Sequence, residues 1–396
     1  MHAILVNDFL FPYLEFCGGS LKAYLMHLFT VCGGGERVSL EIAKALHDVG
    51  FNVVYVTNSS KCLRRCAEMF GLSGDYETIE ISSVLEKFLS VGGRFIRYRR
   101  LLLLAKAYEE LMLDEAEGLR VDTSTNVPFK VDVSYIHYPA VLGTTKSETL
   151  YWRLYNWVVE LKVRRIAGNP KLVITNSLWS AKLVREVYGL EAEVVHPPVD
   201  VDYFTYDSRT KEKVIVTVSR FTPEKKLHLL PRVASKLSEY EWYLAGSTGS
   251  TWIERSVSKT IVRRIESEVR ENKVRNFYVI PNIPREELRE LLLRATYYVH
   301  PPFAEHFGIA VAEAMAAGCI PIVYRDGGAW TDIVSQIYEG LGYNDLSEVP
   351  LIIKSIENSP NLINELRVKA ITQVQQYRSE VFREKFIEIL KRRGII

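Results

Sequence analysis

The strongest constraint on the fold is an alternation that runs along the whole chain. Short apolar runs rich in Val, Ile and Tyr alternate with longer segments whose apolar residues recur at helical spacing. Strands separated by helices form parallel sheets, because a parallel neighbour is reached only through a long crossover connection. At 396 residues a single core would be unusually large. The sequence therefore predicts an α/β protein with two doubly wound domains.

The apolar runs predict strands in both halves of the chain. In the first half these are residues 23–30, 52–57, 131–137, 171–175 and 192–195, and in the second 214–218, 242–245, 277–280, 297–300 and 321–323. The helical patterns cover residues 36–49, 150–166, 178–188, 227–237, 253–271, 285–294 and 309–317. A last helix at 380–391 is expected to pack back on the first domain. Residues 1–20 resemble an extra strand and turn.

A proline pair followed by a polar stretch marks the expected domain boundary. Pro197 and Pro198 fix the direction of the chain, and residues 206–213 are polar enough to remain solvated. We therefore expect an N-terminal domain at 1–205 and a C-terminal domain at 206–396. Ligands of such sheets bind at the carboxyl ends of the strands, so the site is expected in the cleft between the domains.

Composition and charge exclude several classes of protein. A net charge of +2 gives no field that would attract nucleic acid. There is no run of about 18 apolar residues for a membrane span, and no basic stretch precedes the first apolar segment, so a cleaved signal is not expected. The five Cys are few and odd in number, which suits a reducing interior. Cys62 and Cys66 lack a second pair to complete a zinc site, so no metal is predicted.

A glycine loop at residues 33–35 follows a predicted strand and opens a predicted helix. Glycines let the backbone approach a ligand closely, and free N–H groups at a helix start attract anions. Gly34 and Gly35 are therefore candidates for binding a phosphate or a sugar, although a tight turn without a ligand is the alternative. The loop is not the dinucleotide pattern G-x-G-x-x-G, and the next strand ends at Thr57 rather than at an acid, which disfavours a dehydrogenase.

The strongest candidate site follows the strand that ends at His300. A helix starting near Gly308 would point its N–H groups at a diphosphate. Two carboxylates flank this start: Glu305 lies at its mouth, where it can face a sugar, and Glu313 lies deeper, where it can accept hydrogen bonds from ribose. A solvated helix start with a capping acid is the weaker alternative.

Two cations and a histidine occupy other predicted strand ends. Arg220 and Lys225 follow a second-domain strand, where they can hold a diphosphate and stabilise it as a leaving group; ordinary surface charge is the alternative. His137 ends an apolar strand before Tyr138 and Pro139, and we expect it to donate a hydrogen bond to a sugar hydroxyl unless it is structural.

These elements together resemble the retaining GT-B glycosyltransferases of the glycogen-synthase-like family, which includes the phosphatidylinositol mannosyltransferases. The E-x7-E element at Glu305 and Glu313 and the Arg220/Lys225 pair carry the resemblance from about residue 22 to the C-terminus. The segments GGGERV, IHYP, NS-x-W, HPP-x-D and EHFGI are most similar to the α-1,2-mannosyltransferases that extend dolichol-linked oligosaccharides. Residues 140–143 differ from those enzymes, and we expect no N-terminal anchor like theirs.

The resemblance implies a GT-B fold of two Rossmann-like domains and a retaining, metal-independent hexosyltransferase that takes mannose from GDP-mannose. A nucleotide sugar is then a co-substrate, no cofactor is needed, and the acceptor is a glycan or a lipid-linked glycan. It also implies roles for the candidate residues. Gly34 and Gly35 would approach the donor or acceptor closely, His137 and Glu305 would contact the transferred sugar, and Glu313 would bind the ribose. Arg220 and Lys225 would stabilise the leaving diphosphate, and the donor would bind to the backbone of Phe307, Gly308, Ile309 and Ala310.

Two further points stay open at this level. Residues 87–106 contain basic and apolar residues and no acidic residue. This pattern suits a cytoplasmic protein that contacts the inner face of an anionic membrane, and it equally suits an ordinary amphipathic helix. The alternative functions are a UDP-sugar-dependent glycosyltransferase, a sugar-nucleotide epimerase, a phosphorylase, and a binding module without catalysis.

Overall fold

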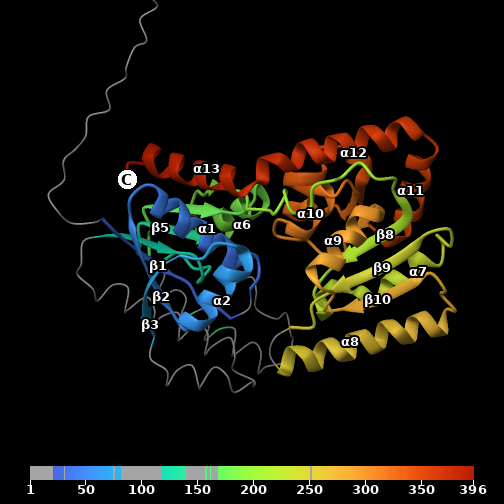
Figure 1. The fold of residues 1–396 in the computed structure, drawn as a ribbon, viewed down its shortest axis with the longest axis horizontal. Coiled ribbons are helices and arrows are strands. Elements are labelled where there is room, and N and C mark those ends of the chain that lie inside the picture. Colours follow the sequence, from blue (N-terminus) through green and yellow to red (C-terminus); the bar gives the residue numbers. More distant parts are fainter. Residues whose placement is uncertain are drawn as a thin grey trace, which may run out of the picture.

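The structure is a computed structural model, and it describes residues 21–30, 32–74, 76–81, 118–139, 157, 161, 168–249 and 252–396. Two parallel sheets lie beside each other, each flanked by helices (Figure 1). The predicted α/β architecture with two doubly wound sheets is therefore confirmed. The expected strand at 1–20, the segment 87–106 and nearly all of the expected helix at 150–166 lie outside the described residues.

The first sheet has seven strands in the order β3-β2-β1-β4-β5-β6-β7. The strands are β1 (Lys22–Met26), β2 (Asn52–Thr57), β3 (Glu77–Glu80), β4 (Leu119–Asp122), β5 (Val133–Ile136), β6 (Leu172–Thr175) and β7 (Glu193–Val194). Every residue of the central strands β5 and β6 is buried, as expected for a parallel sheet covered on both faces. The helices of this half are α1 (Gly34–Asp48), α2 (Ser60–Phe70) and α6 (Leu178–Tyr188).

The second sheet has six strands in the order β10-β9-β8-β11-β12-β13. The strands are β8 (Glu212–Val218), β9 (Glu241–Gly246), β10 (Phe277–Pro281), β11 (Ala295–Val299), β12 (Ile320–Tyr324) and β13 (Gly342–Tyr343). The helices are α7 (Leu230–Ala234), α8 (Trp252–Glu271), α9 (Arg285–Arg294), α10 (Ile309–Ala316), α11 (Val349–Glu357), α12 (Pro360–Val374) and α13 (Ser379–Arg392). Within the described residues, none of the helices is both long and apolar enough to cross a bilayer.

The last helix returns to the first domain. In Figure 1, α12 lies over the second sheet while α13 runs across to α1 and the first sheet. Phe382 and Phe386 of α13 belong to the same buried apolar cluster as the first-sheet strands. The second sheet has a separate cluster. The division at residue 205/206 stays a prediction, with α13 crossing back over it.

Some predicted elements differ from the structure. The strand predicted at 23–30 ends at Met26, and the helix predicted at 227–237 is a 3₁₀ turn followed by the short α7. Pro231 near the start of α7 has no N–H to continue the hydrogen bonding of a longer helix. Strands β3, β4 and β13 and helices α2, α11 and α12 had no counterpart in the prediction.

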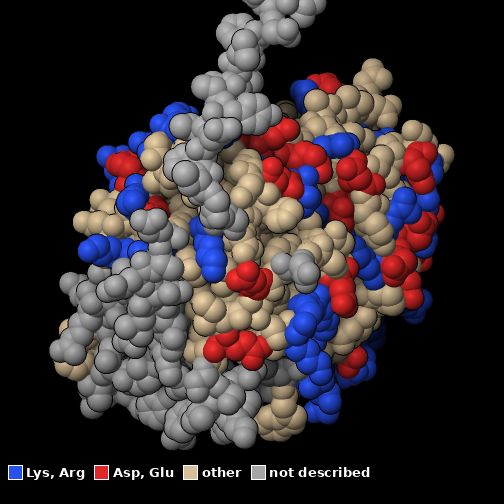
Figure 2. Space-filling view, turned by 60° about the vertical axis from the view of Figure 1, so that its left-hand side comes forward, with Lys and Arg blue, Asp and Glu red and all other residues tan. Residues whose placement is uncertain are grey.

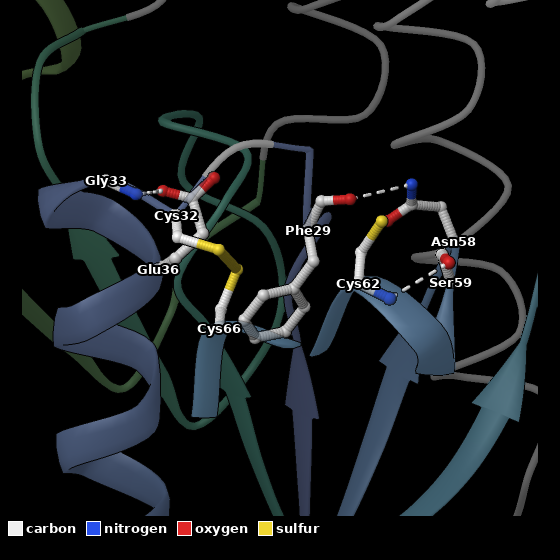
Figure 3. The surroundings of a disulfide bond; sticks show 8 residues. All are labelled: Phe29, Cys32, Gly33, Glu36, Asn58, Ser59, Cys62 and Cys66. Carbon is white, nitrogen blue, oxygen red and sulfur yellow. Dashed lines mark hydrogen bonds between the residues drawn. A yellow bond between two sulfur atoms is a disulfide. The ribbon is translucent and has the colours of Figure 1, made fainter. Parts of the chain in front are cut away.

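The cysteines also differ from expectation. Cys32, just before the glycine loop, forms a disulfide with Cys66 of α2, with 5.1 Å between the Cα atoms (Figure 3). This bond contradicts the interpretation of the cysteines as the free thiols of a reducing interior. Among the described residues, Cys62 and Cys319 remain free.

Candidate active site between the two sheets

A cavity of about 560 Å³ lies where the two domains meet. The first domain lines it with the glycine loop, His137 and Asn176, and the second domain with the loop after β8 and the segment leading into α10. The volume is in the range of small-molecule sites. Of the candidate site residues, all line this cavity except Glu313.

The glycine loop forms the tightest contact across the cavity. A Cβ atom on Gly34 would lie 2.6 Å from Cδ1 of Ile309, and one on Gly35 would lie 3.7 Å from Nε2 of His137. Gly33 is the N-cap of α1, and its N–H donates to Oε2 of Glu36 at 3.1 Å. Glycine therefore lets the start of α1 approach the start of α10 directly.

His137 is a neutral imidazole in the lining of the cavity. Burial lowers its pKa to about 4, with an opposing contribution from Thr123. Its Nε2 lies 3.2 Å from the Thr123 carbonyl oxygen, which only accepts, so Nε2 carries the proton and Nδ1 remains an acceptor. The predicted contact of His137 with a sugar hydroxyl stays a prediction, and with this tautomer Nδ1 would accept the hydroxyl hydrogen.

Lys225 and Glu305, which were assigned separately to diphosphate and sugar, contact each other. Nζ of Lys225 donates to Oε2 of Glu305 at 2.5 Å and lies 3.7 Å from the centre of the Phe303 ring. Lys225 is 5% exposed, and a buried ammonium group requires such a partner. Arg220, in contrast, is exposed at the cavity and forms no ion pair with any residue that the structure describes.

Glu305 is held in its ionised form. Burial opposes its charge, but His300 and the positive charge of Lys225 outweigh it and hold the pKa well below its usual value. Nε2 of His300 lies 3.5 Å from Oε2 of Glu305. His300 itself is buried at the end of β11, and burial lowers its pKa.

Helix α10 directs its first turn at the same cavity. Gly308 has a φ of +106°, a conformation that favours glycine, and the N–H groups of Val311 and Ala312 already bond to its carbonyl. The N–H groups of Ile309 and Ala310 have no carbonyl partner within the helix. These amides and Arg220 together can bind the oxygens of a diphosphate.

Glu313 lies away from the cavity, among charges at the domain junction. Burial raises its pKa to about 7, partly offset by Arg285 and Arg37, while Asp200 adds to the rise. Arg37 lies 3.6 Å from Asp200, which also pairs with Arg285. The predicted ribose contact of Glu313 stays a prediction.

Several cavity residues were not among the predicted ones. Asn176 donates to the His137 carbonyl at 3.0 Å, His306 stacks on Tyr138, and His300 approaches Glu305. Their position next to predicted strand ends was the available signal: His300 closes β11, and Asn176 follows β6.

Comparisons with known proteins agree with this arrangement. Residues 201–343 match the family model "Glycosyl transferases group 1". The chain is 26% identical over 268 residues to GDP-Man:Man(3)GlcNAc(2)-PP-Dol alpha-1,2-mannosyltransferase of Dictyostelium discoideum, covering 62% of this chain and 51% of that protein. The Homo sapiens protein of the same name is 26% identical over 307 residues, covering 65% and 60%. The chain thus spans about half the length of the first of these relatives.

Solved structures share the fold. WaaG, a glycosyltransferase involved in lipopolysaccharide biosynthesis, has a TM-score of 0.65 at 14% identity, with 93% of this chain and 99% of that chain covered. A glycosyltransferase from Rickettsia africae ESF-5 has a TM-score of 0.60 at 16% identity, covering 95% and 99%. The chain therefore has the GT-B fold, and its residues 201–343 are similar to the glycosyl transferases of group 1.

Proposed function

We propose that this chain is a retaining hexosyltransferase that moves mannose from GDP-mannose onto a glycan or lipid-linked glycan. One observation carries the proposal: an unpaired arginine, the free amides of α10 and the Lys225–Glu305 pair all line one cavity. The names of the curated relatives support GDP-mannose as donor and a lipid-linked oligosaccharide as acceptor.

The leaving diphosphate is the group for which this site is best equipped. Negative charge grows on it as the bond to the sugar breaks, and fixed cations and amides that bind this charge lower the barrier. Arg220 and the amides of Ile309 and Ala310 are free for this task, and Lys225 can share its charge between Glu305 and a phosphate oxygen. These cations supply the stabilisation that a divalent metal would otherwise give.

The transferred sugar would lie on the side of Lys225 that faces Glu305 and His137. Glu305 remains ionised and can accept hydrogen bonds from sugar hydroxyls, and Nδ1 of His137 can accept another. The acceptor hydroxyl attacks on the face that the diphosphate leaves, so the anomeric configuration is retained. No carboxylate is assigned as a nucleophile.

Transfer is tested with the purified chain, a short-chain polyprenyl-diphosphate oligosaccharide and a panel of GDP- and UDP-sugars. We expect a mass increase of one hexose with GDP-mannose, and an α-linkage by NMR. Arg220→Ala should lower turnover by about 10²–10³, whereas Arg255→Ala, an exposed arginine on α8, should not. Transfer from UDP-sugars alone would show that the donor is a UDP-sugar and not GDP-mannose. Epimerisation of the donor without transfer, or no reaction with any donor, would overturn the proposal.

A lipid-linked acceptor also leads us to propose peripheral contact with an anionic membrane through residues 87–106. Cosedimentation with vesicles containing anionic lipid tests this contact. Binding at low salt that weakens as salt is added is expected, and no binding at low salt would contradict it.

A further inference from the structure

The loop that carries Glu305 is attached to the first domain through the next residue. The ring of Tyr138, which follows β5, stacks on the ring of His306 with 4.1 Å between centroids and 5° between planes. The hydroxyl of Ser177, the N-cap of α6, donates to the carbonyl oxygen of His306 at 2.7 Å. Glu305 points into the second domain toward Lys225, whereas His306 contacts the first.

Ser177 links this loop to the start of α6. Its oxygen accepts from the N–H of Ser180 at 3.0 Å, which caps the helix, and its one hydrogen is left for the His306 carbonyl. Ser177 is fully buried, so water does not compete for either bond. The cap of α6 and the position of residue 306 therefore depend on the same hydroxyl.

The second domain holds the same loop from the other side. The N–H of Gly328 donates to the carbonyl of Glu305 at 2.6 Å. A Cβ on Gly328 would lie 2.1 Å from the carbonyl oxygen of His306 and 2.8 Å from Cβ of Ser177, so the three segments pack with no spare room. A shift of Ser177 must therefore move the backbone of residues 305–306.

A second contact seats α6 against the same region. The carboxylate of Asp332, whose side chain is fully buried, accepts from the N–H of Leu178 at 2.6 Å and lies 3.0 Å from Nε2 of His196. Asp332 belongs to the π-helical turn Ala329–Val334, which directly follows Gly328. The start of α6 thus docks on two consecutive pieces of the second domain.

We propose that Tyr138 and Ser177 are positioning residues that act through His306 to fix the Glu305 carboxylate opposite the sugar. The inference rests on the proposed function and adds a requirement to it: the sugar side of the site is complete only while the first domain is seated on residues 305–306. The diphosphate side shares Lys225 with Glu305, but it also draws on Arg220 and the start of α10, which line the same cavity.

Because the sugar side and the diphosphate side differ in this way, we expect a change at Tyr138 or Ser177 to affect the rate of the chemical step more than nucleotide binding. Displacing Glu305 by about an ångström lowers the rate of the chemical step by up to about 10²-fold. It should leave nucleotide affinity within about twofold, because Arg220 and the amides at the start of α10 remain to bind the diphosphate. Displacement also weakens the contacts with Lys225 and His300 that keep Glu305 ionised. The acid limb of the pH–rate profile should therefore move to higher pH.

One matched pair and one single variant test this in the full chain. Tyr138→Ala removes the stacked ring and Tyr138→Phe keeps it, whereas Ser177→Ala removes the hydroxyl. We expect both alanine variants to lose kcat about 10- to 100-fold, with the acid limb moved and the GDP dissociation constant unchanged by calorimetry. Tyr138→Phe, which keeps the stacked ring, should behave as wild type.

The outcomes separate the inference from the function on which it rests. A wild-type chain that transfers no sugar contradicts the proposed function. An active wild type whose alanine variants keep kcat, or lose kcat and GDP affinity in proportion to a loss of melting temperature, overturns the positioning role. Ser177→Ala also removes the N-cap of α6 and could prevent folding. In that case Tyr138→Ala, which leaves the cap intact, tests the positioning role.

Discussion

The contact between Lys225 and Glu305 changes how the site must work. Either residue alone is an ordinary candidate for binding, but a 2.5 Å pair with a nearly buried lysine is a single unit. Removing one member leaves the other charge buried without a partner. Donor binding therefore has to redistribute the charge of Lys225 between Glu305 and the phosphate.

Lys225→Ala is expected to lower turnover by about 10²–10³, because it removes positive charge from the leaving group. Without Lys225 the pKa of Glu305 should rise toward its usual value, so activity should also fall at a higher pH on the acid side. Rates over a pH series measure both effects. Lys226→Asn, next in sequence and exposed, is the control, since Asn tolerates the positive φ at this position. Near-wild-type turnover of Lys225→Ala would exclude the lysine from the mechanism.

Glu313 gives a pH dependence of stability that the sequence did not predict. Its folded pKa, raised to about 7, means that the folded state keeps a proton which the unfolded chain has already lost. Stability therefore falls as pH rises through this window. Glu313→Gln, which cannot ionise, should match wild type near about pH 4.5 and exceed it by about 1–3 kcal/mol at about pH 8.

Urea unfolding of both proteins at the two pH values measures this difference. Glu384→Gln, which changes an exposed glutamate of α13, should give the same difference from wild type at both pH values. An equal difference for Glu313→Gln at both pH values would mean that folding does not raise the pKa of Glu313.

Single residues were predictable where a pattern surrounded them. Glu305, Gly308 and Arg220 follow apolar runs and precede helices, so their place at strand ends was visible in the sequence. For His300 the strand end showed the position but not the partner, and His306 lies beyond any strand end, so their contacts with Glu305 and Tyr138 could not be predicted.

Elements were predicted best where both ends carry a stop signal. Helix α6 has the predicted bounds because Ser177 caps its start and Gly189, with a φ of 68°, ends it. Helix α2 has equivalent signals in Ser59 and Gly71, but its sequence is rich in charged residues, and only Leu63, Cys66 and Ala67 are buried. The four-residue strand β4 is recognisable only from the strands on either side of it.

The disulfide belongs to this scale, because it joins two elements. Cys32 and Cys66 are 34 residues apart, and closing a loop of that length lowers the entropy of the unfolded chain by an amount equivalent to about 3–4 kcal/mol. We expect a phosphine reductant to lower the melting temperature of the wild type by calorimetry. Cys32→Ser should melt at the lower temperature with or without the reductant.

Cys62→Ser, one turn before Cys66 on α2, is the matched control. It should show the same response to the reductant as the wild type. The pairing is contradicted if the reductant no longer lowers the melting temperature of Cys62→Ser. It is also contradicted if the melting temperature of the wild type stays unchanged although its thiols titrate as reduced.

At the scale of the whole molecule, the last helix joins the two domains. Arg383 of α13 pairs with Glu41 of α1 at 2.5 Å, and the side chain of Glu41 is only 2% exposed. Charges of both signs occur side by side over the face drawn in Figure 2, in keeping with the small net charge. Specific pairs, rather than a general field, therefore attach α13.

Arg383→Ala should cost about 3–5 kcal/mol, because it leaves Glu41 charged and buried without a partner. Arg392→Ala, on the same helix, should cost less than about 1 kcal/mol, since Arg392 pairs with Glu193 near the surface. Denaturant unfolding of the two variants measures the difference, and equal costs would mean that the Arg383 pair is as well solvated as the outer one.

The sequence by itself determined the α/β class, most of the strands and the residues at their carboxyl ends, because hydrophobic period, caps and glycines act over a few neighbouring positions. Only the tertiary structure decided which of those residues meet: Lys225 with Glu305, His306 with Tyr138, and Cys32 with Cys66. Such contacts depend on the order of strands in two sheets and on how the domains dock, and packing over long sequence separations sets both.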